Sequence, residues 1–80
     1  LPDKVFDYNK MKEILGAAID KLPQKEKLVV SLYYYEDLTL AEIGEIMELT
    51  PARISQLHTK SIFRLRGYLG QKKELLVEFS

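Results

Sequence analysis

Residues 53–73 combine hydrogen-bonding side chains with positive charge and contain no carboxylate. Six Lys or Arg residues lie in this stretch, whereas residues 36–48 hold five acids and no base. Ser55 and Gln56 carry polar groups suited to the edges of bases, and basic side chains neutralise phosphates. The pattern therefore favours non-covalent recognition of a nucleic-acid duplex. The six basic residues are Arg53, Lys60, Arg64, Arg66, Lys72 and Lys73.

A helix that begins after Thr50 would separate these side chains from an apolar face. Thr50 is a favourable N-cap residue and Pro51 suits the first helical position, so two independent start signals coincide. At 100° per residue one side gathers Ile54, Leu57, Ser61, Ile62, Leu65, Tyr68 and Leu69. The opposite side gathers Ala52, Ser55, Gln56, Thr59, Lys60, Phe63 and Arg66, with Arg53 and Arg64 at its edge.

A shorter helix is predicted just before it, from Thr39 to Met47. Thr39 and Glu42 form the Thr-x-x-Glu capping box. Glu48 and Leu49 then make the turn; a left-handed backbone at Glu48 would cost roughly 1 kcal/mol. Two helices joined by a tight turn predict a helix-turn-helix over about residues 39–66, whose second helix enters the major groove.

The N-terminal half supplies the supporting helices. Asp7 or Asn9 can cap a first helix, which must stop near Leu22 because Pro23 follows, and a second helix runs from Pro23 to about Glu36. Its expected buried face is Leu28, Val29, Leu32, Tyr33 and Tyr35. The first helix has an amphipathic stripe of Met11, Ile14, Leu15, Ala18, Ile19 and Leu22.

The expected fold is all-α, a single domain over residues 1–80 with four to five helices. Gly67 and Gly70 weaken the end of the fourth helix, and residues 71–80 are expected to form a short tail helix. Residues 1–8 are expected to be linker or part of the domain. Because the chain starts at Leu1 rather than Met, we expect it to be a piece of something longer.

Composition excludes several classes of function. The chain has 80 residues, a formal net charge of zero and no Cys, which removes disulfides and thiolate metal sites. His58 stands alone, without the spaced ligands of a metal site. We find no nucleophile with a base and no glycine-rich phosphate loop, so we expect neither an enzyme, nor a cofactor, nor a small-molecule substrate. No membrane helix or signal peptide is recognisable, and a cytoplasmic, nucleoid-associated protein is expected.

Two stretches of the chain resemble region 4, the C-terminal domain of bacterial sigma factors, over about residues 20 to 67. The first contains Leu22-Pro23, Glu26, Leu28-Val29, Leu32, Tyr33-Tyr34-Tyr35 and Leu38-Thr39-Leu40-x-Glu42-Ile43-Gly44. The second is Thr50-x-x-Arg53-Ile54-Ser55-Gln56-Leu57-His58-x-Lys60-x-x-x-Arg64-Leu65-Arg66. The run of three tyrosines and the Ser-Gln-Leu-His sequence are most similar to those of flagellar or motility sigma factors.

The resemblance implies binding to the minus-thirty-five promoter element while docked on the β flap of RNA polymerase. It also implies control by an anti-sigma protein. Housekeeping members carry an Arg-Glu pair where this chain has Pro51 and Ala52. Because Arg and Glu are strong readers of G·C pairs, an A/T-rich element is expected here. Gln56 and Ser55 would read adenine, and Ala52 would contact a thymine methyl.

The candidate residues fall into two groups. We expect DNA contacts from Thr39, Thr50, Ala52, Arg53, Ser55, Gln56, Thr59, Lys60 and Arg64. We expect a protein interface at Phe63, Leu75 and Leu76. At least one of the basic residues is expected to pair with Glu42, Glu45 or Glu48. His58 lies near the apolar side and is expected to pack rather than to touch DNA.

Two other interpretations stay open. The chain could be the helix-turn-helix output domain of a response regulator or another transcription factor that dimerises on a palindromic site. It could also be a helical protein-interaction module whose basic face serves an acidic partner.

Overall fold

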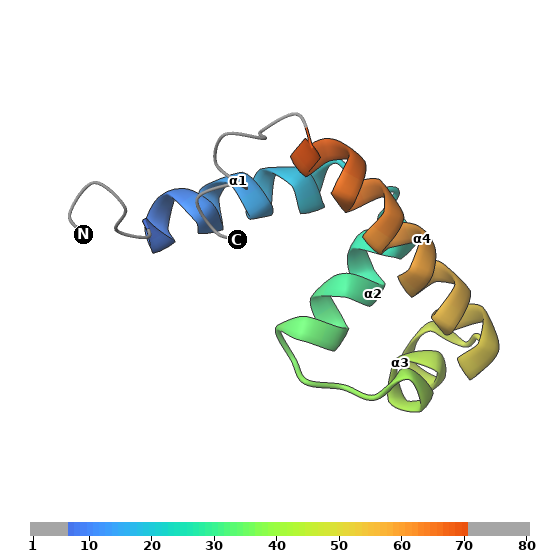
Figure 1. Cartoon of the computed structure of the whole chain (residues 1–80). Helices are drawn as coiled ribbons and strands as arrows, with labels where there is room; N and C mark the ends of the chain where they lie inside the picture. Colours follow the sequence, from blue (N-terminus) through green and yellow to red (C-terminus); the bar gives the residue numbers. More distant parts are fainter. Residues whose placement is uncertain (1–6, 71–80) are drawn as a thin grey trace.

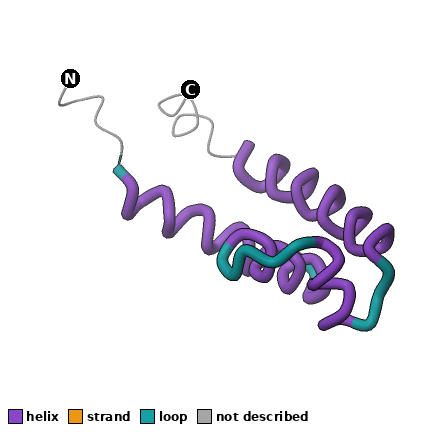
Figure 2. The backbone as a smooth tube through the Cα atoms, turned by 90° about the horizontal axis from the view of Figure 1, so that it is seen from below, coloured by secondary structure: helices purple, strands orange, loops and turns teal. Residues whose placement is uncertain are grey.

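In the computed structural model, which describes residues 7–70, the chain is built from helices and short loops (Figure 1). These residues form α1 (Tyr8–Asp20), α2 (Gln24–Tyr34), α3 (Leu40–Met47) and α4 (Pro51–Gly70), with no strand among them. The helix α4 packs against each of the other three. Figure 2 shows the short loops that join the helices. The predicted all-α class is confirmed, and the predicted tail helix falls outside the described residues.

Local signals at the helix ends explain where α1 and α2 begin. The carboxylate of Asp7 accepts a hydrogen bond of 3.0 Å from the backbone N–H of Lys10, so Asp7, not Asn9, caps α1. Pro23 occupies the N-cap position of α2, and its carbonyl accepts from the N–H of Lys27 at 2.9 Å. The proline ring cannot continue α1, so the chain changes direction there.

Two hydrophobic clusters hold the helices together, and α2 and α4 contribute to both. Val29 and Val30 are adjacent in sequence but enter different clusters, because α2 lies against α4 with α1 at one end and α3 at the other (Figure 1). The first cluster has Ala18, Ile19, Leu22, Val30 and Leu65 as its buried members. The second has Val29, Ile43, Ile54 and Leu57. Burial of each large aliphatic side chain contributes about 1.5–3 kcal/mol.

The predicted buried face of α2 is partly wrong. Leu28 is 43 % exposed and Tyr35 is 63 % exposed, whereas Val30, which was not predicted, is buried. The helix α2 ends at Tyr34 rather than near Glu36, and Tyr35 is its C-cap residue, where the side chain is exposed although its backbone N–H still donates to the carbonyl of Ser31 at 3.0 Å. Val30 packs in the first cluster, whereas Leu28 belongs to neither cluster.

Candidate nucleic-acid interface

The helix α3 begins with the predicted capping box. The backbone N–H of Glu42 donates to Oγ1 of Thr39 at 3.1 Å, and the N–H of Thr39 donates to Oε1 of Glu42 at 2.9 Å. The backbone hydrogen bond from Thr39, with a smaller contribution from its hydroxyl, lowers the pKa of the exposed Glu42 carboxyl. Glu42 therefore serves the cap.

The turn after α3 depends on one left-handed residue and one glycine. Glu48 has φ 58°, a left-handed backbone. The N–H groups of Glu48 and Leu49 both donate to the carbonyl of Gly44, at 2.9 Å for Leu49, and this closes the helix end. A Cβ added to Gly44 would lie 2.6 Å from the carbonyl oxygen of Leu49. Only glycine allows so close an approach.

Sequence reasoning quoted Gly44 within the family pattern but missed this structural role. A signal was present, because a glycine four residues before the predicted turn is unusual inside a helix. Glycine there weakens the helix unless a neighbouring backbone comes close. In this fold the chain folds back over that glycine toward α4.

The helix α4 begins where both start signals placed it. Oγ1 of Thr50 accepts from the backbone N–H of Arg53 at 3.1 Å, and the carbonyl of Thr50 accepts from Ile54 at 3.0 Å. Pro51 is the first helical residue. The helix then runs unbroken through Gly67 to Gly70, so the expected weak point at Gly67 does not end it.

The orientation of α4 agrees with the predicted division of its sides. Ile54, Leu57, Ser61 and Leu65 are buried. Ala52, Ser55, Gln56, Thr59, Lys60 and Arg66 are exposed. Their exposure is therefore as expected, while contact of these residues with DNA stays a prediction. Along this exposed side of α4, the N-terminal turns carry short polar side chains and the later turns carry basic ones. The opposite side of the helix packs in the core.

Arg53 is half-buried at the edge of this exposed side and contacts Gln56. Its Nη1 lies 3.4 Å from Oε1 of Gln56. With Oε1 accepting from the guanidinium, the amide nitrogen of Gln56 is left to donate. This weak bond also restricts the Gln56 side chain in the second turn of α4, where a groove-inserted helix would meet bases.

Arg64 is committed to a partner that sequence reasoning did not identify. Its Nε lies 3.0 Å from Oε1 and 3.2 Å from Oε2 of Glu26 in α2. The Glu26 side chain is 5 % exposed and that of Arg64 is 48 % exposed. The expectation that a basic residue pairs with Glu42, Glu45 or Glu48 is wrong for the described residues, whose ion pairs are Arg64–Glu26 and Lys27–Asp20.

The reason for this error is geometric. Glu42 is committed to its cap, and Arg64 lies at the edge of α4 that faces α2. Only Nε takes part in the hydrogen bonds that hold Arg64 within residues 7–70. The two Nη groups are therefore able to reach a phosphate while Nε stays anchored.

His58 packs against the tyrosines of α2, as its place near the apolar side predicted. Its Nε2 lies 2.9 Å from the hydroxyl of Tyr34. Its ring centroid lies 5.0 Å from that of Tyr33 and 5.7 Å from that of Tyr34. These contacts connect the middle of α4 to the C-terminal end of α2.

Phe63 is the most exposed large apolar side chain of the described residues, at 79 %. It lines a surface groove of about 770 Å³ together with Thr59, Lys60, Arg64 and Gly67. The other two predicted interface residues, Leu75 and Leu76, lie outside the described residues. Phe63 thus points outward beside the basic side chains, and its partner stays a prediction.

Residues 7–70 offer neither a metal site nor a membrane-spanning helix. No group of three or more His, Cys, Asp or Glu side chains in this part of the chain is placed to hold a metal ion. None of its helices has the length and hydropathy needed to cross a bilayer.

Comparison with known proteins agrees with this geometry. The family model for sigma-70, region 4 matches residues 18–67. RNA polymerase sigma factor FliA of Escherichia coli K12 is 46 % identical over 68 residues, which is 85 % of this chain and 28 % of that protein. RNA polymerase sigma-D factor of Bacillus subtilis is 51 % identical over 55 residues, 69 % of this chain and 22 % of that protein.

A second FliA, from Pseudomonas aeruginosa, is 50 % identical over 56 residues, 70 % of this chain and 23 % of that protein. The chain thus spans about a quarter of the length of the relatives it matches. The matched segment contains the two buried clusters, the capped turn and most of α4. The chain belongs to the sigma-70 region 4 family.

Proposed function

We propose that this domain binds the minus-thirty-five element of promoter DNA through α4, as the promoter-reading arm of a flagellar-type sigma factor. Region 4 of sigma-70 is a DNA-binding domain and not an enzyme. The observation that carries the proposal is the exposed row Ala52, Ser55, Gln56 and Thr59 on the first turns of a capped helix whose opposite side is buried.

Binding would follow the helix-turn-helix geometry. The first turns of α4 enter the major groove, and α3 crosses the backbone. Lys60 on α4 and the free guanidinium nitrogens of Arg53 and Arg64 contact phosphates. The N-termini of α3 and α4, capped by Thr39 and Thr50, would lie toward the DNA, where unpaired N–H groups favour anions. These contacts position the domain and carry no sequence information.

Base readout would come from the polar row. Gln56 hydrogen-bonds an adenine edge, Ser55 makes a second polar contact, and Ala52 packs on a thymine methyl. None of these three side chains supplies the bidentate guanidinium or the carboxylate acceptor that favours G·C pairs. The proposed element is therefore rich in A·T pairs.

The test compares Gln56→Ala with Ser61→Ala, a buried position that faces away from the DNA. In the intact sigma factor with RNA polymerase, Gln56→Ala lowers transcription from the A/T-rich promoter and reduces the preference over a base-substituted promoter. The loss corresponds to about 1–3 kcal/mol at the base that Gln56 reads. An equal loss on every sequence would argue against base readout.

The wider assembly is part of the proposal. A module that reads a few base pairs, at about 1–3 kcal/mol per mismatch, cannot address a genome alone. We infer that the domain acts in the cytoplasm, at the nucleoid, while docked on the β flap of RNA polymerase. An anti-sigma protein would restrain it.

Exposed apolar side chains support protein docking. Leu28, Tyr35, Ile46 and Phe63 are all exposed in the described residues. The affinity of the domain for a β-flap fragment is measured for the parent chain, Phe63→Ala and Ile46→Ala. Each measurement is made with and without the anti-sigma protein. Loss of binding in either variant locates the docking face. Unchanged binding in both would remove these side chains from the interface.

A further inference from the structure

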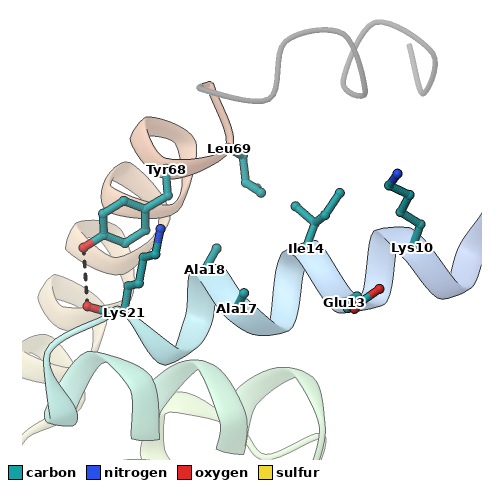
Figure 3. Close-up of a pocket in the computed structure, with 8 residues that line it drawn as sticks. All are labelled: Lys10, Glu13, Ile14, Ala17, Ala18, Lys21, Tyr68 and Leu69. Atoms are coloured by element: carbon teal, nitrogen blue, oxygen red, sulfur yellow. Dashed lines mark hydrogen bonds between the residues drawn. The ribbon is translucent and has the colours of Figure 1, made fainter.

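The N-terminal half of α1 carries an apolar stripe that α4 does not cover. Leu15, Ala18 and Ile19 pack in the first cluster, but Ile14, one turn before Ala18, belongs to neither cluster of the described residues. A groove of about 400 Å³ lies here, between α1 and the end of α4 (Figure 3). Its apolar lining is Ile14, Ala17, Ala18 and Leu69.

One end of the groove is closed by contacts between the two helices. The hydroxyl of Tyr68 donates to the carbonyl of Lys21 at 3.5 Å, and the Lys21 ammonium lies 5.7 Å from the centre of the Tyr68 ring. The other end opens along α1 toward Lys10, beyond the last residues of α4 (Figure 3). An occupant would therefore lie along α1, past the end of α4.

We propose that residues 71–80 of this chain occupy that groove and pack along α1. The segment follows Gly70, and Leu69 already lines the groove, so the segment begins at the edge of the groove. Ten residues in helical form cover about 15 Å, at about 1.5 Å per residue. The stretch of α1 from Lys10 to Ala18 is about as long, since it rises by the same amount per residue.

The composition of the segment matches the groove. Residues 74–79 are Glu-Leu-Leu-Val-Glu-Phe, with four apolar residues, two acids and no base. In helical form Leu75, Leu76 and Phe79 share one face, because positions three and four apart are neighbours. Glu74 and Glu78 lie together on an adjacent side.

Charge at the rim favours the same occupant. The groove is bordered by Lys10 and Lys21, against a single carboxylate from Glu13. In this arrangement Glu74 and Glu78 lie near the two ammonium groups of the rim, and the segment's own bases, Lys72 and Lys73, precede them in the chain. The exposed surface around Phe63 is the alternative binding place for Leu75, Leu76 and Phe79. The experiment below distinguishes that surface from the groove. This inference does not depend on promoter binding.

Engineered disulfides test the position directly, because the chain has no cysteine of its own. Ala17 is exposed and lines the groove, so Ala17→Cys leaves the core intact. It is combined with Leu75→Cys in one full-length chain and with Leu76→Cys in another. The matched controls replace Ala17→Cys by Phe63→Cys. A disulfide needs Cα atoms within about 7 Å of each other.

Mild oxidation is expected to close an intramolecular disulfide in at least one chain with Ala17→Cys and in neither control. Closure through Phe63→Cys instead would overturn the proposal, because the segment would then cover the outer face of α4. Disulfide-linked dimers without monomeric product would overturn it in favour of a second copy. Closure in none of the chains would also overturn it.

Amide hydrogen exchange provides a readout without cysteines. The double substitution Leu75→Ser and Leu76→Ser in the full chain is expected to speed exchange several-fold in residues 12–17 and to leave α3 unchanged. The control Tyr35→Ser removes an exposed aromatic side chain elsewhere and should not alter α1. Unchanged exchange in α1, or a change confined to residues 59–67, would contradict the proposal.

Discussion

The guanidinium of Arg64 is anchored by Glu26, whose almost fully buried carboxylate lies 3.0 Å from Nε. The two residues are 38 positions apart, so the pair fixes α4 against α2. A buried carboxylate needs this partner, because water does not reach it. The pair therefore joins α4 to the core of the domain.

Arg64→Ala is expected to lower the free energy of unfolding by about 1–3 kcal/mol, because it leaves the Glu26 carboxylate without its charged donor. Arg64→Lys should recover only part of the loss, since an ammonium cannot reproduce the guanidinium geometry. Urea unfolding is measured for Arg64→Ala, for Glu26→Gln and for the double variant that carries both substitutions. Together with the parent chain, these variants complete a double-mutant cycle. Strictly additive effects would mean that the two side chains do not stabilise each other.

Gly44→Ala is expected to destabilise the domain by about 1–3 kcal/mol, as overpacking does. The added Cβ would lie 2.6 Å from a backbone oxygen of the turn, which cannot move without shifting α3 against α4. Gly16→Ala is the matched control. Nothing lies within 4 Å of a Cβ at Gly16, so this helical substitution should stabilise by about 0.5–1 kcal/mol. Equal effects of both in thermal unfolding would exclude the close approach as the cause.

Glu48→Gly is expected to stabilise the chain by about 1 kcal/mol, because glycine adopts the left-handed backbone at φ 58° without steric cost. Glu45→Gly has the same composition change inside α3 and should destabilise by about 1 kcal/mol. The difference in urea midpoint between the two variants checks the sign. A loss of stability in Glu48→Gly would mean that the Glu48 side chain contributes more than the strain.

The capping box makes stability depend on pH on the acid side. The pKa of Glu42 is lowered in the folded chain from its ordinary value of 4.5, chiefly by the Thr39 backbone N–H. The stabilisation is therefore present above pH 4.5 and is lost as the pH falls through the lowered folded pKa.

Glu42→Gln should remove this dependence and flatten the curve of unfolding free energy against pH below 4.5. Glu45→Gln, on the same helix but outside the cap, serves as the control for the loss of one negative charge. A curve for Glu42→Gln that falls as steeply as that of the parent chain would exclude the cap as the source.

The parts that could be predicted from sequence are those set by near neighbours. Thr39 with Glu42, and Thr50 with Pro51, act within three residues, so the starts of α3 and α4 could be placed. The apolar side of α4 follows from its period of 3.6 residues. Each of these signals is local, and each is confirmed.

The parts that could not be predicted depend on packing between distant segments. Val30 is buried because α2 lies between two clusters, and no single helical stripe describes such a face. Glu26 meets Arg64 across the fold, and charge counts alone favoured the nearer acids of α3. The role of Gly44 needs the path of the turn backbone, which is known only once α3 and α4 are docked.

Lys60→Ala is expected to weaken binding to all promoter sequences and to reduce the slope of log affinity against log salt by about one unit. Lys60 is exposed on the outer side of α4, beyond the polar row, where a phosphate would lie. Gln56→Ala should leave the salt slope unchanged while it alters sequence preference, because an amide releases no counterion. Lys12→Ala removes an exposed ammonium from α1 and controls for net charge. If Lys12→Ala changed the slope as much as Lys60→Ala, the field of the whole domain, rather than contact at α4, would account for the attraction to DNA.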